Sequence, residues 1–255
     1  MPEQTQQGVE AFVLAGGKSL RIGQDKAFLP WEGQTLLERA LEATQAVASR
    51  TRIVGAKAKF EAYGSVVEDV FVDRGPLGAI HAALSATDRE FNLVLAVDLP
   101  FATAALLAYL IGRAHETPCL ATVPRLGGGW EPLCAVYRRE FAKVAEPALK
   151  RGQNAIYPLL DGPLLKDGPR LEDGDDQACA RAGAQEIGVQ EVGVQEVGVR
   201  EIGVQEIGET ELVAAGFGAW MFRNINTIRD FEACAKRSRE PAGSTMLSSK
   251  GLNSE

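Results

Sequence analysis

Short apolar runs alternate with longer amphipathic stretches from Val9 onward, and this alternation limits the fold more than any other feature of the chain. The apolar runs have the length of buried strands and lie at Ala11–Leu14, Thr51–Val54, Ser65–Val67 and Leu93–Val97. Between and after them, apolar residues recur with the period of a helix at Thr35–Ser49, Ala79–Ala86 and Ala102–Ala114. Alternating strands and helices predict βαβ units around a mostly parallel sheet. The nearly continuous apolar run at Leu93–Val97 suits a central strand that is buried on both faces.

The composition fits a globular domain and argues against several other classes of protein. Hydrophobic residues make up 45% of the 255 residues, and charged residues make up 24%. The net charge of -7 argues against a general nucleic-acid binder, which usually has a basic surface. The four cysteines are scattered and the chain has only two histidines, so a structural zinc site or a disulfide framework is not expected.

No targeting or membrane-spanning segment is recognisable in the sequence. Residues 1–7 are polar and contain no Lys or Arg, unlike the start of a signal peptide. Apolar stretches stay well short of the roughly 20 residues that a bilayer requires. We therefore expect a cytoplasmic protein with no membrane partner.

The character of the chain changes after Pro163. Residues 164–183 are rich in Gly, Asp and Glu and read as a loop, and five pentads of the pattern Gln-Glu-Ile-Gly-Val follow over 185–209. A period of five matches neither a helix nor a strand, and glycine at every fifth position weakens both. The repeat is either a mobile low-complexity insertion or a small solenoid with its own binding face. We favour the insertion, because five residues supply little core per copy.

This interpretation defines the expected domain organisation. A single domain covers 9–236 and is interrupted by a mobile insertion over 164–209. The polar residues 237–255 form a disordered tail.

The segment from Leu14 to Lys26, LAGGKSLRIGQDK, carries the clearest chemical signal. Its adjacent glycines, Gly16 and Gly17, allow the backbone to approach a ligand and to present N–H groups, as phosphate-binding loops do. Arg21 and Lys26 add two cations within the same loop. Backbone amides together with two cations make a triphosphate site plausible.

Two known phosphate motifs do not match this segment. The motif G-x-x-x-x-G-K-S/T requires glycine at position 12, which is Phe12, and the fingerprint G-x-G-x-x-G fails because Lys18 follows Gly17. A glycine-rich surface turn with solvated charges therefore stays open as an alternative.

Asp98 supports the functional interpretation. It follows the buried run Leu93–Val97, at the edge of the sheet where α/β proteins bind ligands. A single carboxylate there is a natural ligand for Mg²⁺, which commonly binds one or two carboxylates together with substrate phosphates. Alternatively, Asp98 is the N-cap of the helix that starts near Ala102, and the two roles are compatible.

The ordered motifs of the chain resemble those of the molybdenum cofactor guanylyltransferase (MobA-type) family of nucleotidyltransferases. They are LAGGKSLRIGQDK, Glu68-Asp69, Asp73-Arg74-Gly75-Pro76-Leu77-Gly78-Ala79-Ile80, VDLP at 97–100 and Asn224-Ile225-Asn226-Thr227. The resemblance covers about residues 9–162 and 211–236. It implies a Rossmann-like three-layer α/β domain with a mostly parallel central sheet.

The resemblance also implies roles for individual residues. The nucleotide-binding set is Leu14, Ala15, Gly16, Gly17, Lys26, Gly55, Asp69 and Asp98. The catalytic set is Lys26, Arg21 and Asp98, with the lysine on the phosphates, and Asp98 also holds Mg²⁺. Asn226 is a weaker candidate for the metal or the pterin, and Gly55 stands where relatives have Asn, so a side-chain contact there is lost.

The implied reaction is attack by the terminal phosphate of molybdopterin on the α-phosphorus of GTP, with release of pyrophosphate. An ionised phosphate needs no general base, in agreement with a structural rather than catalytic reading of His81 and His115. Proteins that deliver the cofactor and molybdoenzymes that receive it are candidate partners. Ile228 and the long insertion depart from the family pattern and leave the pterin side open.

Two other functions remain open. A sister cytidylyl- or uridylyltransferase would share the amide-rich loop and the metal aspartate, and would differ in base and acceptor. A nucleotide-binding regulatory protein without turnover would use the pentads as a docking arm. Trp31, Trp130 and Trp220 are interpreted as packing residues, and Cys134 as a small buried hydrophobic residue.

Overall fold

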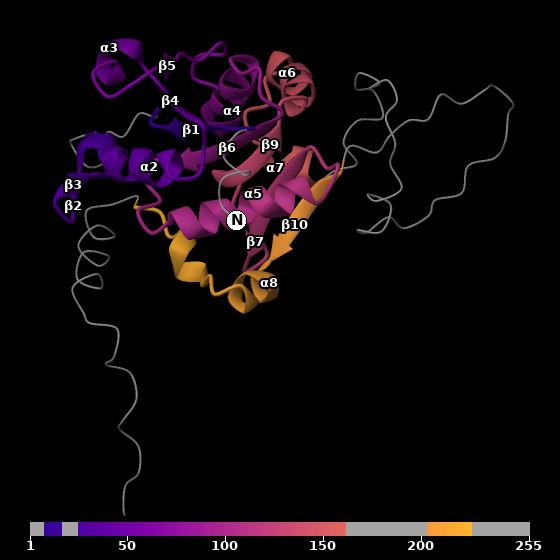
Figure 1. The fold of residues 1–255 in the computed structure, drawn as a ribbon. Helices are drawn as coiled ribbons and strands as arrows, with labels where there is room; N and C mark the ends of the chain where they lie inside the picture. The colour runs from indigo at the N-terminus through magenta and orange to yellow at the C-terminus, as the bar shows by residue number, and fades with distance from the viewer. Residues whose placement is uncertain (1–7, 17–24, 162–202, 226–255) are drawn as a thin grey trace, which may run out of the picture.

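A computed structural model describes residues 8–16, 25–161 and 203–225 of the chain. The main sheet of these residues has eight strands in the order β10-β7-β9-β6-β1-β4-β5, and β8 pairs with β7 (Figure 1). A separate two-stranded sheet joins β2 (Pro30–Trp31) to β3 (Gln34–Thr35). The main sheet is mixed but mostly parallel and is flanked by helices, which confirms the expected fold class.

Four parallel strands form one half of the sheet. In spatial order they are β6 (Phe91–Ala96), β1 (Val9–Leu14), β4 (Arg50–Val54) and β5 (Val66–Val67). Each coincides with one of the apolar runs that predicted it, within a few residues at its ends. Every residue of β1 and β6 is buried, as expected for strands covered on both faces.

Three helices match the stretches with helical periodicity: α2 (Leu36–Gln45), α5 (Ala104–His115) and α4 (Gly75–Ser85), which begins four residues before the expected stretch. The sequence patterns did not predict α3 (Lys57–Phe60), α6 (Phe141–Lys150) or α7 (Tyr157–Asp161). Thr35 begins α2 with a capping box, in which its hydroxyl accepts from the Glu38 N–H and the Glu38 carboxylate accepts from the Thr35 N–H. Pro76 near the start of α4 costs little, because the first helical N–H groups lack partners in any helix.

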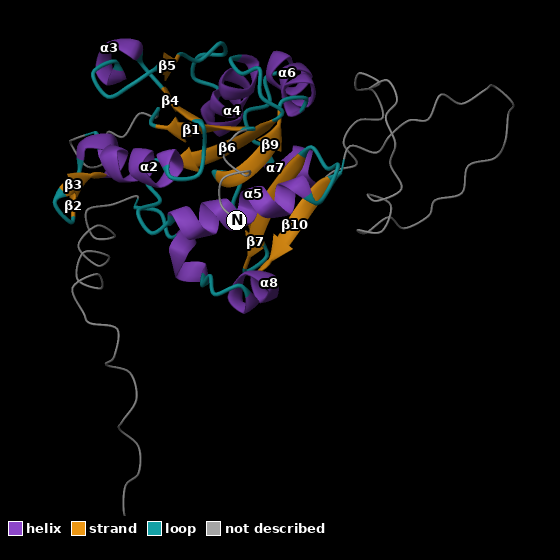
Figure 2. Cartoon of the chain, viewed as in Figure 1, coloured by secondary structure: helices purple, strands orange, loops and turns teal. Residues whose placement is uncertain are grey.

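Alternate side chains of the central strands pack into two separate hydrophobic cores, one on each face of the sheet. Ala11 and Val13 of β1 pack with α2 and α5, whereas Phe12 and Leu14 pack with α4 and α6 on the opposite face. Figure 2 shows these helix pairs on the two sides of the sheet. The period of two along a strand thus produces the three layers.

The other half of the sheet contains both strand directions. Strand β9 (Cys134–Arg138) runs antiparallel to β6 and to β7 (Ala121–Leu126), and β8 (Gly129–Trp130) forms a hairpin with β7. Strand β10 (Val204–Gly208) pairs in parallel with β7 at the sheet edge, followed by α8 (Glu209–Ala214) and the turn η3 (Ala219–Phe222).

The structure corrects the expected insertion boundary at residue 209. Val204 and the first four residues of the last pentad form β10, so this end of the repeat belongs to the sheet and not to a mobile insertion. The physical reason is that Ile207 is completely buried in the core beside α5, while Gln205 accepts a hydrogen bond from the Thr122 hydroxyl. The rest of the repeat and the tail over 237–255 lie outside the described residues.

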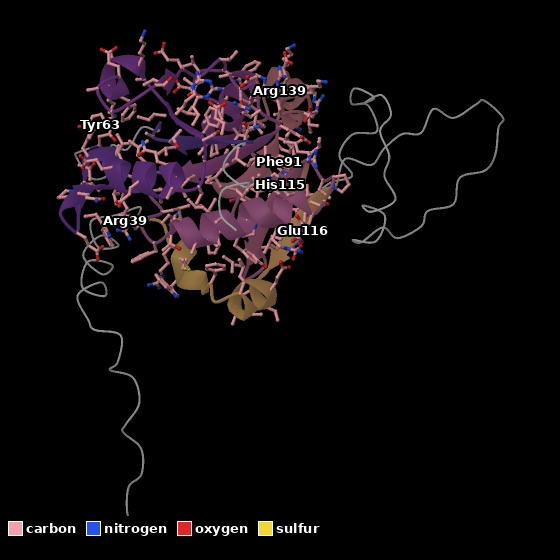
Figure 3. The ribbon with its side chains drawn as sticks, in the orientation of Figure 1. Arg39, Tyr63, Phe91, His115, Glu116 and Arg139 are labelled. Carbon is pink, nitrogen blue, oxygen red and sulfur yellow. The ribbon has the colours of Figure 1, made fainter. Side chains whose placement is uncertain are left out.

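Several single-residue expectations can be compared with this fold. Trp31 and Trp130 are buried, and Trp220 is 52% exposed but packs edge-on against Phe101, with 5.5 Å between the ring centroids. His81 is buried in α4, and His115 stacks on Phe91 at 4.1 Å between ring centroids (Figure 3). Cys134 is buried, and burial raises the pKa of its thiol to about 12. In the described part of the chain, every helix is too short or too polar to span a bilayer.

Candidate active site

The register of the four parallel strands brings the candidate residues to one edge of the sheet. Leu14 pairs with Ala96 on one side and with Val54 on the other, and Val54 pairs with Val67. The four strands therefore reach their carboxyl ends side by side. The loops that follow all leave from this edge, the usual ligand-binding edge of an α/β sheet.

Three backbone hydrogen bonds extend this alignment beyond the strands. The Ala15 N–H donates to Val54 O at 3.0 Å, the Gly55 N–H to Val67 O at 3.0 Å, and the Val97 N–H to Leu14 O at 3.1 Å. The start of each loop is thus held in place by its neighbour.

Gly16 and Gly55 lie against each other at this edge. A Cβ at Gly16 would lie 3.8 Å from Val54 O and 3.9 Å from the Gly55 Cα, which is ordinary contact. A Cβ at Gly55 would lie 2.8 Å from the Phe60 ring, so the ring occupies the space that a side chain would need. This explains in packing terms why glycine stands at position 55.

Lys26 and Asp98 form an ion pair across the site. The Lys26 Nζ lies 3.3 Å from the Asp98 Oδ2, and the two side chains are 18% and 21% exposed. Lys26 starts the short 3₁₀ turn η1 (Lys26–Phe28), and Asp98 follows β6 by two residues. A cation and a carboxylate from loops that are 72 residues apart are thereby brought together.

Asp98 does not cap helix α5, a structural role that its sequence position allowed. The N-cap of α5 is Thr103, whose hydroxyl accepts from the Leu106 N–H, so the N-cap alternative for Asp98 is wrong. The Asp98 carbonyl accepts a hydrogen bond from the Ile225 N–H at 2.9 Å. The C-terminal segment therefore reaches the site at Ile225, and Asn226 itself lies outside the described residues.

Asp69 lies two residues after the end of β5, and one of its carboxyl oxygens could accept a hydrogen bond from a ligand. Burial raises the pKa of Asp69, and the nearby negative charge of Asp73 raises it further. Its Oδ1 is buried and accepts no hydrogen bond from the described residues. A buried acceptor of this kind is stabilised when a donor reaches it, for example an N–H or O–H of a bound nucleotide.

Gly17 and Arg21, which the sequence also selects, lie outside the described residues, as does the stretch between Gly16 and Asp25. The strand register and the loops place the other candidate residues at the carboxyl edge of the sheet. These residues are Leu14, Ala15, Gly16, Lys26, Gly55, Asp69 and Asp98.

Sequence reasoning missed two charged residues near this edge. Lys59 of α3 forms an ion pair with Asp25 beside η1, and no motif in the sequence marks it. Glu131 lies three residues before β9. This segment is held next to the end of β6, because the Ala96 N–H donates to Leu133 O. Burial raises the pKa of Glu131. Its position directly before an apolar run was the available signal.

Asp98 is the described side chain best suited to hold a metal ion at this edge. Within the described ranges, no group of three or more His, Cys, Asp or Glu side chains is arranged to bind a metal. One carboxylate is nevertheless enough for Mg²⁺ when substrate phosphates and water supply the other ligands. Backbone amides, one lysine and one carboxylate fit the charge of a nucleoside triphosphate better than they fit a hydrolytic metal centre.

Comparison with known proteins decides the family. The model of the MobA-like NTP transferase domain matches residues 11–163, more than half of the chain. This protein belongs to the MobA-like NTP transferase family. It is a nucleotidyltransferase, and the matched region contains most of β1, together with η1, β6 and the loop with Asp98.

Named relatives agree with this assignment. A probable molybdenum cofactor guanylyltransferase of Pyrococcus furiosus is 35% identical over 155 residues, which are 58% of this chain and 78% of the relative. The molybdenum cofactor guanylyltransferase of Desulfosudis oleivorans is 34% identical over 60% of this chain and 77% of its own length.

Two solved structures support the fold. The molybdopterin-guanine dinucleotide biosynthesis protein A of Archaeoglobus fulgidus has a TM-score of 0.66 at 22% identity, with 90% of this chain and 98% of that chain covered. The 2-C-methyl-D-erythritol 4-phosphate cytidylyltransferase of Thermus thermophilus has a TM-score of 0.52 at 16% identity, with 90% and 98% covered. At these identities the likeness concerns the fold alone.

Proposed function

We propose that this nucleotidyltransferase transfers GMP from GTP to the terminal phosphate of molybdopterin. The relatives named molybdenum cofactor guanylyltransferase support the substrates. The observation that carries the proposal in the structure is the Lys26–Asp98 pair at the edge where four parallel strands end. A cation for phosphates and a carboxylate for a metal lie there at 3.3 Å from each other.

In the proposed reaction, an oxygen of the acceptor phosphate attacks the α-phosphorus of GTP. A new phosphoanhydride bond forms, the bond between the α-phosphorus and the bridging oxygen breaks, and pyrophosphate leaves. The attacking phosphate is already ionised near neutral pH, so the protein need not remove a proton. Its contribution is to position the reactants and to stabilise the negative charge that builds up on the phosphates.

Each described residue has a task in this scheme. The backbone at Ala15 and Gly16 approaches the nucleotide, and the Lys26 ammonium neutralises the phosphates. Asp98 would hold Mg²⁺, and the ion would supply positive charge against the phosphates. The Lys26 ammonium, which pairs with Asp98 in the structure, would contact the phosphates in the complex. The buried Oδ1 of Asp69 accepts a hydrogen bond from the nucleoside. Arg21, Gly17 and Asn226 keep their expected roles as part of the proposal.

Nucleotide selectivity tests this proposal first. The protein is titrated with GTP, CTP, UTP and ATP in the presence of Mg²⁺, and binding is followed by calorimetry and thermal shift. Binding confined to GTP supports the guanylyltransferase and justifies a pyrophosphate-release assay with molybdopterin. A preference for CTP or UTP would overturn the substrate and favour a sister enzyme of the same fold.

A further inference from the structure

The Asp25 carboxylate connects two parts of the molecule through its two oxygens. Its Oδ1 accepts a hydrogen bond from the Ala27 N–H at 3.0 Å and so caps η1, the turn that contains Lys26. Its Oδ2 forms an ion pair with the ammonium of Lys59 in α3. One side chain therefore joins the turn that contains the phosphate lysine to a helix more than 30 residues further along the chain.

The Lys59 ammonium lies beside two aromatic rings that pack on each other. Its Nζ lies 5.1 Å from the centroid of the Phe60 ring and 5.9 Å from that of Phe28, within the range of cation–π attraction. Phe28 belongs to η1 itself, and its ring also lies 5.5 Å from that of Tyr63 (labelled in Figure 3). The ammonium thus contacts the turn twice, through Asp25 and through Phe28.

Helix α3 is a firm support for this contact. The Phe60 ring is 1% exposed and fills the space beside Gly55 at the end of β4. At the other end of α3, the Lys57 N–H donates to the Glu68 Oε1 at 3.1 Å. The backbone of α3, which carries Lys59, is therefore held against the parallel strands whose ends form the candidate site.

We propose that Lys59 is a positioning residue, which holds η1 through Asp25 so that the Lys26 ammonium meets the nucleotide phosphates. Lys59 contacts the turn and not the phosphates. This role rests on the proposed function, because that function assigns Lys26 to the phosphates. A site built this way loses affinity when its support is removed even though every contacting group is still present.

The test is a pair of double-mutant cycles, with GTP affinity in the presence of Mg²⁺ measured by calorimetry. Lys59→Met keeps most of the aliphatic stem over the rings and removes the charge. We expect it to weaken GTP binding by about fivefold, a coupling typical of neighbouring groups. In a Lys26→Ala background the same change should have almost no effect on affinity, because the lysine that it positions is gone.

Two further variants separate positioning from other roles. Asp25→Asn retains an oxygen that can cap the Ala27 N–H but loses the ion pair, so it should match Lys59→Met, and the two changes together should not add. Lys59→Arg restores the charge and should recover most of the affinity. Lys57→Met on the same helix is the matched control, with its side chain exposed, and should bind GTP as the unchanged protein does.

The outcomes distinguish this inference from the proposed function. Additive losses from Lys59→Met and Lys26→Ala would overturn the positioning role and indicate that Lys59 binds phosphate directly. A fall in melting temperature without a fall in GTP affinity would overturn it as well and leave a structural role. If the unchanged protein bound no GTP, the proposed function itself would fail. If the unchanged protein bound GTP tightly and the affinity losses of Lys59→Met and Lys26→Ala were additive, the positioning role alone would be overturned.

Discussion

The two halves of the sheet are organised by different means. In the half that carries the candidate site, parallel strands and their connecting helices alternate along one stretch of chain from β1 to β6. Backbone register alone aligns the ends of these strands, from Ala96 through Leu14 and Val54 to Val67. In the other half, β10 arrives from a distant part of the chain and pairs with β7 at the edge.

Side chains add specific contacts to the backbone pairing in that second half. The Thr122 hydroxyl donates to Gln205 over a separation of 83 residues, and Arg125 pairs with Glu206 at 3.1 Å. Glu211 of α8 accepts from the Tyr109 hydroxyl at 2.7 Å and from the Arg113 Nε at 2.8 Å. The comparison indicates that backbone register aligns the strand ends in the site half, whereas the β10 half adds side-chain pairs to the backbone register between β10 and β7.

The largest expected effect concerns the site half. Asp98→Asn keeps the size of the side chain and the backbone carbonyl that accepts from Ile225, but removes the charge that would hold Mg²⁺. We expect turnover to fall by about 100-fold or more with an unchanged melting temperature. Pyrophosphate release from GTP and molybdopterin measures the first, and thermal unfolding the second. Asp88→Asn is the matched control, at an exposed position preceding β6, and near-normal turnover of Asp98→Asn would remove the metal role.

The next prediction uses the repeat to probe the β10 half. Deletion of the five residues 204–208 places the sequence VREIG of 199–203 directly before α8, with the same residue types as β10 at four of its five positions. Deletion of the four residues 205–208 instead places Gly203 where Ile207 was. Because Ile207 is completely buried, the four-residue deletion should cost about 3 kcal/mol or more. The five-residue deletion should cost about 1 kcal/mol, for the contact of Gln205 with Thr122.

Chemical unfolding of both deletion variants measures the difference. Equal losses of stability would show that the pentad sequence does not specify the edge strand. Both variants should retain GTP affinity if the two halves are independent, and a large loss of affinity in either would contradict that independence.

A smaller effect is expected at the contact between α5 and α8. Glu211→Gln weakens two hydrogen bonds at once, and because the glutamate side chain is 36% exposed we expect a loss of about 0.5–1 kcal/mol. Glu206→Gln, whose partner Arg125 is 36% exposed, is the control and should cost less. Thermal unfolding ranks the two, and the reverse order would contradict the importance of the α8 contact.

The smallest expected effect is a pH dependence from His81. Burial lowers the pKa of His81 below its ordinary value of 6.5, and Lys150 of α6 lowers it further, while Glu146 opposes the shift. As pH falls below 6.5, the unfolded chain takes up the proton first, so the folded state loses stability down to the lowered pKa. The difference in melting temperature between His81→Gln and the unchanged protein should therefore vary between about pH 7.5 and about pH 5.5. A constant difference would show that His81 titrates alike in both states.

Much of the fold followed from local patterns in the sequence. The apolar runs marked the four parallel strands because a strand buried on both faces must be apolar along its length. The glycine pair after β1 and the aspartate after β6 marked the candidate site, since loops at the carboxyl ends of parallel strands meet. The same reasoning misplaced β10, whose five-residue period hid a strand that is stable only against β7. It also did not show that half of Trp220 stays exposed, because that exposure depends on how η3 lies on the core.

The sequence by itself determined the βαβ order, the family motifs and the chemical types of the residues at the candidate site. These properties depend on neighbours within a few residues, or on strands that are joined by a single helix. Only the tertiary structure decided that Lys26 meets Asp98, that Lys59 reaches Asp25 and that one pentad completes the sheet. Contacts between distant residues depend on register and packing across the whole domain, and no local pattern carries that information.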